Sequence, residues 1–200
     1  MPAGPSEVAV YADETCNPSF VAADLLSQAE HGADSQVLLV ATAALIVDNV
    51  KKEIEEQLKQ LPRKEIAMKA LVNSRFIVME DTDNAFDLLN EYAAEHLIIA
   101  SDNAALLSEK VVNAGSVFLG HYSPESVGDY ASGTNHTLPT NGYAKAYSGV
   151  SLDSFVKKIT YQQLNENGIR NIGNAVEQMA AAEGLDAHKN AVTIRLKNIK

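Results

Sequence analysis

The chain has 200 residues, 46% of them hydrophobic, with no tryptophan and a formal net charge of −10 at pH 7. This acidity argues against nucleic acid or an anionic membrane surface as a partner. The chain has one cysteine, Cys16, no apolar run near the roughly 18 residues of a membrane span and no signal peptide, which together predict a soluble, cytoplasmic protein.

Residues 1–120 alternate between apolar, β-branched runs and segments with helical periodicity. The expected strands lie at 6–13, 35–42, 75–80, 96–101 and 116–120. The expected helices lie at 17–32, 43–60, 62–74, 81–93 and 102–114. Strands that alternate with helices of this length indicate βαβ units with right-handed crossovers. We therefore predict an α/β fold with a mostly parallel sheet, whose ligand site lies beyond the carboxyl ends of the strands.

The composition changes after residue 120. Residues 121–151 are rich in Gly, Ser, Thr, Asn, Pro and Tyr, and an irregular stretch this long in a compact domain is usually functional or disordered. A short extended piece is expected at 157–165, followed by helices at 166–182 and 185–198. We therefore divide the chain into an α/β domain, 1–150, and a small, mainly helical tail, 151–200. The tail has too few residues for a core of its own, so we expect it to pack on the sheet or on another subunit.

Several polar side chains stand at the ends of the expected elements or in loops. The candidates are Gln28, His31, Glu95, His96, His121, Asp129, His136, Glu183 and His188. Histidine nitrogens with an aspartate oxygen suit zinc, and the amide of Gln28, on the same helical face as His31, would be an unusual further ligand. The adjacent Glu95 and His96 suit acid–base chemistry instead, because both residue types can be tuned towards neutral pH.

Each candidate also has a plain structural explanation. A histidine at position 31 suits a solvated helix C-terminus, where the helix dipole favours a positive charge. Glu95 and His96 could be exposed loop residues, Asp129 a turn residue, and His136 a loop residue packed on Leu138. Glu183 and His188 could be solvated helix positions. The sequence contains no H-E-x-x-H or C-x-x-C pattern, and the glycines near residue 115 form no G-x-G-x-x-G fingerprint.

Longer stretches of the sequence resemble one family. They run in order along the chain and read MPAGPSEV, DLLSQAEHGADSQV, EYAAEHL, NAGSVFLGHYSPESVGDYASGTNHTLPT and AEGLDAHKNAVTIR. These blocks resemble successive parts of the histidinol dehydrogenases, and the resemblance covers residues 1 to about 197. Blocks this long in this order are far more specific than a short motif. The resemblance implies a zinc-containing, NAD-dependent enzyme of histidine biosynthesis that oxidises L-histidinol to L-histidine through an aldehyde.

The resemblance also implies roles for individual residues. Gln28, His31, Asp129 and His188 are the implied ligands of one zinc ion per site, and His188 is implied to come from the partner in a homodimer. His96 is the implied base that takes the hydroxyl proton, and Glu95 is implied to activate water for the second oxidation. The implied substrate contacts are Ser6, Gln28, His31, His96, Asp129, His136, Glu183 and His188.

The sequence departs from the family's pattern at Ala94 and Thr134, where the family has proline. The resemblance further implies that family members carry an N-terminal half with most of the NAD contacts. We therefore expect this chain to be the C-terminal portion, with part of a Rossmann-like domain and a dimerisation tail, and to be inactive alone. Two alternatives stay open, namely a related dehydrogenase of another small alcohol and a non-catalytic metal-binding or assembly module.

Overall fold

The computed structural model describes residues 2–199. The chain forms two compact units, the first ending at Phe155 and the second beginning at Val156. This division lies close to the boundary at 150/151 that the composition predicts. Within the described residues, no helix is both long and apolar enough to cross a membrane.

Five parallel strands form the centre of the first unit. They are β1 (Glu7–Ala12), β2 (Gln36–Ala41), β3 (Arg75–Val78), β4 (His96–Ala100) and β5 (Ser116–Leu119). Their order in the sheet is β3-β2-β1-β4-β5, and every neighbouring pair is parallel. The chain moves outward from β1 to β3 and then returns to place β4 beside β1. The predicted α/β fold with a mostly parallel sheet is confirmed, and its strand order reverses between β1 and β4.

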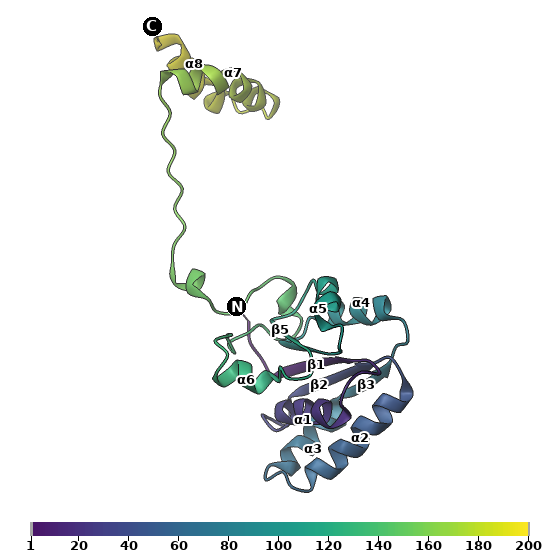
Figure 1. Ribbon diagram of the computed structural model, residues 1–200. Coiled ribbons are helices and arrows are strands. Elements are labelled where there is room, and N and C mark those ends of the chain that lie inside the picture. The colour runs from purple at the N-terminus through teal and green to yellow at the C-terminus, as the bar shows by residue number, and fades with distance from the viewer. Residues whose placement is uncertain (1, 200) are drawn as a thin grey trace. The chain divides into compact units, whose positions relative to one another are not determined.

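Helices cover both faces of this sheet (Figure 1). One face carries α1 (Pro18–Ala29), α2 (Ala44–Leu58) and α3 (Lys64–Asn73), and the other carries α4 (Thr82–Tyr92) and α5 (Ala104–Leu107). Side chains alternate along β1, so that Val8 and Val10 pack towards α1 while Ala9 and Tyr11 pack towards α4. Because both faces are buried, the strands read as continuous apolar runs.

The structure differs from the sequence-based expectation after β4. The helix expected at 102–114 is shorter, with α5 followed by a 3-10 turn at Ser108–Lys110. The stretch 121–151, expected to be irregular, contains α6 (Glu125–Tyr130) and a 3-10 turn at Tyr143–Lys145. A helix of six residues makes less than two turns, so its apolar periodicity is too short to detect in the sequence.

The carboxyl ends of β1 and β4 are closed by hydrogen bonds among their own loops. The carboxylate of Asp13, 8% exposed, accepts the Ser101 hydroxyl at 2.5 Å and the Thr15 backbone N–H at 3.0 Å. The Thr15 hydroxyl in turn accepts the backbone N–H of Asp102 at 2.9 Å. The polar groups at this edge are therefore paired with one another, although ligands of open α/β sheets usually bind there.

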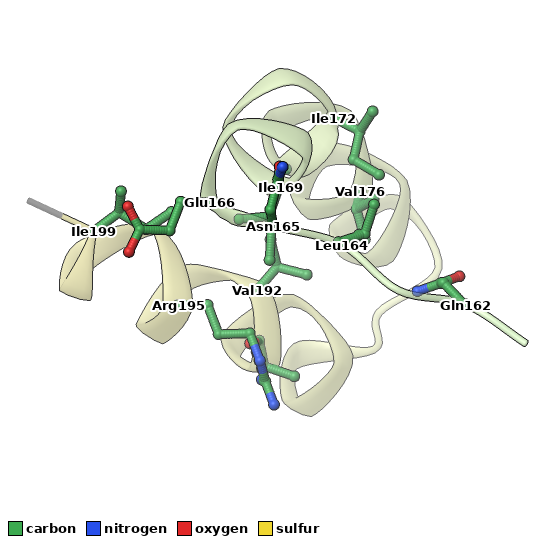
Figure 2. A pocket seen from close by; sticks show the side chains of 12 residues that line it. Gln162, Leu164, Asn165, Glu166, Ile169, Ile172, Val176, Val192, Arg195 and Ile199 are labelled. Carbon is green, nitrogen blue, oxygen red and sulfur yellow. Dashed lines mark hydrogen bonds between the residues drawn. The ribbon is translucent and has the colours of Figure 1, made fainter.

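The second unit is a helical hairpin of α7 (Glu166–Ala182) and α8 (Asp186–Asn198) (Figure 2). These bounds agree with the helices expected at 166–182 and 185–198, whereas residues 157–165 form no strand. Figure 2 shows a groove along the hairpin, with apolar side chains that include Ile172 and Val176. Ile172 is 46% exposed and Val176 37%, so the hairpin leaves part of its apolar side uncovered within its own unit.

The carboxyl-edge hydrogen bonds predict a stability effect. The Ser101→Ala substitution leaves the buried Asp13 carboxylate without one donor, and we expect the free energy of unfolding to fall by about 1.5–3 kcal/mol. Urea denaturation followed by circular dichroism measures this change. Ser108→Ala is the matched control, because that hydroxyl donates to the Ala105 carbonyl at an exposed position. Equal effects of the two substitutions would contradict the prediction.

Candidate functional site

The candidate site lies at the amino edge of the sheet, where the strands begin. The prediction that the site lies beyond the carboxyl ends of the strands is therefore wrong. A helix that follows a parallel strand runs back antiparallel to it, and the C-terminus of α1 therefore returns to the amino ends of the strands. Gln28, fully buried in the last turn of α1, lies with its amide 3.2 Å from the backbone nitrogen of Glu7, the first residue of β1. Glu95 immediately precedes β4 and His96 begins it.

The backbone of Glu7 contacts both Glu95 and His96, the predicted acid–base pair. Its N–H donates to Glu95 Oε2 at 3.0 Å, and its carbonyl oxygen lies 3.1 Å from His96 Nδ1. A carbonyl can only accept, so His96 carries its proton on Nδ1 and leaves Nε2 as the free base. Among the described residues Nε2 has no hydrogen-bond partner, and it lies 3.9 Å from Asp129 Oδ1.

Burial shifts the pKa of both members of this pair in the direction that favours the uncharged form. Burial is the main cause that raises the pKa of Glu95 to about 7, and the negative charges of Glu7 and Asp129 act in the same direction. Burial also lowers the pKa of His96, which keeps the imidazole neutral near pH 7. A neutral imidazole with a free Nε2 can accept a proton from a substrate hydroxyl.

Close contact between two backbone segments positions this pair. The N–H of Gly115, which precedes β5, donates to the carbonyl of Ala94 at 2.9 Å. A Cβ atom at position 115 would lie 2.4 Å from the carbonyl oxygen of Glu95. Only glycine therefore fits where β5 approaches the start of β4.

Helix α6 adds two carboxylates to the site. Glu125 and Asp129 are four residues apart and share one face of α6. Gly128 allows the helix to lie against β5, since a Cβ atom there would be 2.6 Å from the Phe118 ring. Glu125 is 2% exposed, so its carboxylate is enclosed rather than solvated.

Three ligand-type side chains converge at this point. Single ligand atoms of His31, Glu125 and Asp129 all lie within 4.8 Å of one another. The amide of Gln28 adjoins them, 2.7 and 2.8 Å from the two carboxylate oxygens of Glu125. Imidazole nitrogen with carboxylate and amide oxygens is a donor set that suits zinc. The residues present at this edge therefore fit a divalent cation.

The charges around this cluster are mostly of one sign. Burial is the main cause that raises the pKa of Glu125 to about 8, and the negative charges of Asp129, Glu95 and Asp24 act in the same direction. Burial also raises the pKa of Asp24 to about 7. Carboxylates this close together disfavour one another's ionised forms, and a cation among them stabilises those ionised forms.

The structure brings together only part of the predicted set. The predicted residues that lie around the cluster are Gln28, His31, Glu95, His96 and Asp129. Ser6 directly precedes β1, and exposed His136 lies in the stretch after α6, where its charge acts on His96. His121 lies beyond β5 at the opposite edge and pairs with Asp102 at 3.0 Å.

Two predicted residues belong to the second unit. Glu183 is the C-terminal cap of α7, and His188 lies near the start of α8. Both are exposed within that unit. Their assignment as substrate and zinc contacts stays a prediction.

The sequence-based reasoning missed three acidic residues of the site, Glu7, Asp24 and Glu125. A signal for Glu125 is present, because Pro124 followed by a glutamate is typical of a helix start and places Glu125 one turn before Asp129. Glu7 at the start of a buried strand is a similar signal, since a charge there requires a partner. Asp24 has no comparable signal in the sequence.

Comparisons with known proteins agree with the resemblance in the sequence. The sequence model of a family described as histidinol dehydrogenase matches residues 1–196. The chain is 62% identical over 200 residues to a histidinol dehydrogenase of Bacteroides thetaiotaomicron, a match that covers 100% of this chain and 47% of that protein. It is 57% identical over 201 residues to a chloroplastic histidinol dehydrogenase of Arabidopsis thaliana, covering 100% of this chain and 43% of that protein.

A solved structure agrees with these matches. The crystal structure of histidinol dehydrogenase from Elizabethkingia anophelis matches with a TM-score of 0.94 at 61% identity, over 98% of this chain and 46% of that one. The chain thus spans about half the length of the curated relatives it matches. The assignment of this chain to the C-terminal portion stays a prediction. With a family match over nearly its whole length, the chain belongs to the histidinol dehydrogenase family.

Proposed function

We propose that this chain supplies the metal, substrate and proton-transfer groups of a histidinol dehydrogenase, which oxidises L-histidinol to L-histidine with zinc and NAD. The observation that carries the proposal is the convergence of His31, Asp129 and the free Nε2 of His96 at one edge of the sheet. The family match supports the choice of substrate, because the relatives are named histidinol dehydrogenases.

Zinc would be held by His31, Asp129 and Gln28 of one chain, as the resemblance implies. When bound, zinc supplies open positions that can hold nitrogen atoms of the substrate and orient it. His31 is exposed at the rim of the cluster, whereas Gln28 is buried at its floor. Because His31 is exposed and Gln28 is buried, a substrate would reach the cluster from the side of His31.

His96 would act as the base for the substrate hydroxyl. Its Nδ1–H donates to the Glu7 carbonyl, so the single proton of the neutral ring is on Nδ1. Nε2 therefore keeps a free lone pair that can accept a proton. An alcohol carbon releases hydride readily only as its hydroxyl proton leaves, and a neutral imidazole can accept that proton. Glu95, with a pKa raised to about 7, would activate the water for the second oxidation.

The residues at the strand reversal do not fit NAD. A dinucleotide site there needs a glycine-rich turn with free backbone N–H groups for the pyrophosphate. The turn after β1 instead carries Asp13 and Glu14, and the Asp13 carboxylate is already paired with Ser101. The resemblance implies that most NAD contacts lie outside this chain.

The proposed enzyme is a homodimer in which the partner's His188 completes each zinc site. The uncovered apolar side of the α7–α8 hairpin supports an interface, since such a surface is stabilised by burial. Ser6, His136 and Glu183 would contact the substrate, as the resemblance implies. A cytoplasmic location stays a prediction, because one relative is named as chloroplastic.

The buried carboxylates predict a pH dependence of the metal-free protein. Folding raises the pKa of Asp24 from 3.8 to about 7, so between these values the folded state binds more protons than the unfolded state. Asp24 therefore destabilises the fold increasingly as the pH rises through this window. We expect Asp24→Asn to stabilise the chelator-treated protein more at about pH 8 than at about pH 5, as measured by urea denaturation. The control Asp48→Asn, at an exposed position of α2, should show no such difference; a parallel response of both variants would contradict the prediction.

The metal and substrate site predicts coupled binding. We expect isothermal titration of L-histidinol into the zinc-loaded chain to show binding. The His31→Ala substitution should lower the affinity for zinc by at least about tenfold and abolish the heat signal of histidinol binding. His31 is exposed, so its substitution should leave the fold intact. His121→Ala, which removes a histidine at the opposite edge, should bind both as the unaltered chain does. The site would be refuted by identical titrations of the two variants.

The shared zinc site predicts complementation between variants. His31→Ala and His188→Ala chains should each bind zinc weakly alone, because each homodimer lacks one ligand at both sites. When the two are co-expressed with different tags, the heterodimer should bind one zinc ion, at the site that combines an intact His31 with the partner's His188. Metal analysis of the purified heterodimer measures this ratio. A heterodimer without zinc would show that both histidines must come from one chain.

A further inference from the structure

Glu125 occupies a position in the site to which the resemblance assigns no role. It lies in the first turn of α6, is 2% exposed, and faces the amide of Gln28 at 2.7 and 2.8 Å. A carboxylate buried to this extent needs hydrogen-bond donors or a cation as partners.

The amide of Gln28 can meet Glu125 in two orientations. With its nitrogen towards Glu125, the amide donates to both carboxylate oxygens, and its oxygen accepts the Glu7 backbone N–H at 3.2 Å. With its oxygen towards Glu125, three oxygens converge, and they repel one another unless a proton on the carboxyl or a cation lies among them. The first orientation therefore suits an ionised Glu125 without a metal, and a cation among the oxygens favours the second.

The distances also place Glu125 within reach of a shared ion. Its carboxylate belongs to the three groups whose ligand atoms lie within 4.8 Å of one another, with His31 and Asp129. Ligand atoms about 2.0–2.2 Å from one zinc ion are at most about 4.4 Å apart, so small movements bring all three into contact with it.

A second observation points to the same place. His96 is 4% exposed, and its Nε2 has no partner among the described residues while it lies 3.9 Å from Asp129 Oδ1. A buried polar atom without a partner at the edge of a carboxylate cluster indicates that a further group belongs there.

We propose that Glu125 is itself a ligand of the zinc ion in the substrate-free protein, and that zinc binding turns the Gln28 amide so that its oxygen faces the ion beside the Glu125 carboxylate. The inference rests on the proposed function, because it concerns the same ion. It adds a fourth ligand from this chain to Gln28, His31 and Asp129, and it makes the orientation of Gln28 depend on the metal.

The test compares two acid-to-amide variants of the chain. Glu125→Gln removes the proposed ligand, whereas Asp24→Asn removes a nearby, partly buried carboxylate that lies outside the group of convergent ligand atoms. Zinc affinity is measured by competition with a chromogenic chelator, and coordination by the visible absorption of the Co²⁺-loaded chain. We expect Glu125→Gln to lower the affinity for zinc by about 10- to 100-fold and to change the absorption spectrum of the Co²⁺-loaded chain. Asp24→Asn should change the affinity by less and leave the spectrum unaltered.

The outcomes separate this inference from the function on which it rests. If Glu125→Gln matches Asp24→Asn in affinity and spectrum while His31→Ala loses zinc, Glu125 is not a ligand and the proposed zinc site stands. If the unaltered chain binds no zinc, both proposals are overturned. Glu125→Asp, which keeps the charge and shortens its reach, covers a failure of the amide variant to fold. Weaker zinc binding by that variant supports the inference, and unchanged affinity and spectrum overturn it.

Discussion

The backbone of Glu7 forms two hydrogen bonds on which the candidate site depends. Its N–H holds Glu95, and its carbonyl holds Nδ1 of His96. Both bonds exist because β4 pairs with β1 in parallel, in a register that places His96 opposite Val8. A backbone group cannot change its position by rotating a side chain, so the pair is held as rigidly as the sheet itself. The orientation of His96 therefore follows from the strand order.

Strand reversal usually creates a ligand crevice at the carboxyl edge, and here polar groups at that edge are paired with one another. Asp13, Thr15 and Ser101 satisfy one another's hydrogen bonds there. The unsatisfied polar atoms lie at the other edge instead, where Nε2 of His96 and one carboxylate oxygen of Glu7 lack partners among the described residues. Buried polar atoms that the fold leaves unpaired are candidates for ligand binding, so we place the candidate site at the amino edge.

The cluster of buried carboxylates is unfavourable for the metal-free fold and favourable for a cation. Glu95, Glu125 and Asp24 all have pKa values raised by burial, which means that folding opposes their ionised forms. The sheet and its two apolar cores stabilise the unit enough to hold these groups together. The same repulsion that weakens the fold strengthens the attraction for a divalent ion.

The sequence by itself determined the alternation of strands and helices, the parallel sheet and, through its resemblance to one family, most of the site residues. These features are local, since apolar periodicity and the blocks that resemble the family are read from neighbouring residues. Only the tertiary structure decided which edge carries the site, because the direction of α1 relative to β1 is a property of the packed crossover. It also decided that Glu7 and Glu125 belong to the site, 118 positions apart along the chain. Contacts over such a separation depend on the assembled sheet and on the short helix α6, and no local pattern specifies them.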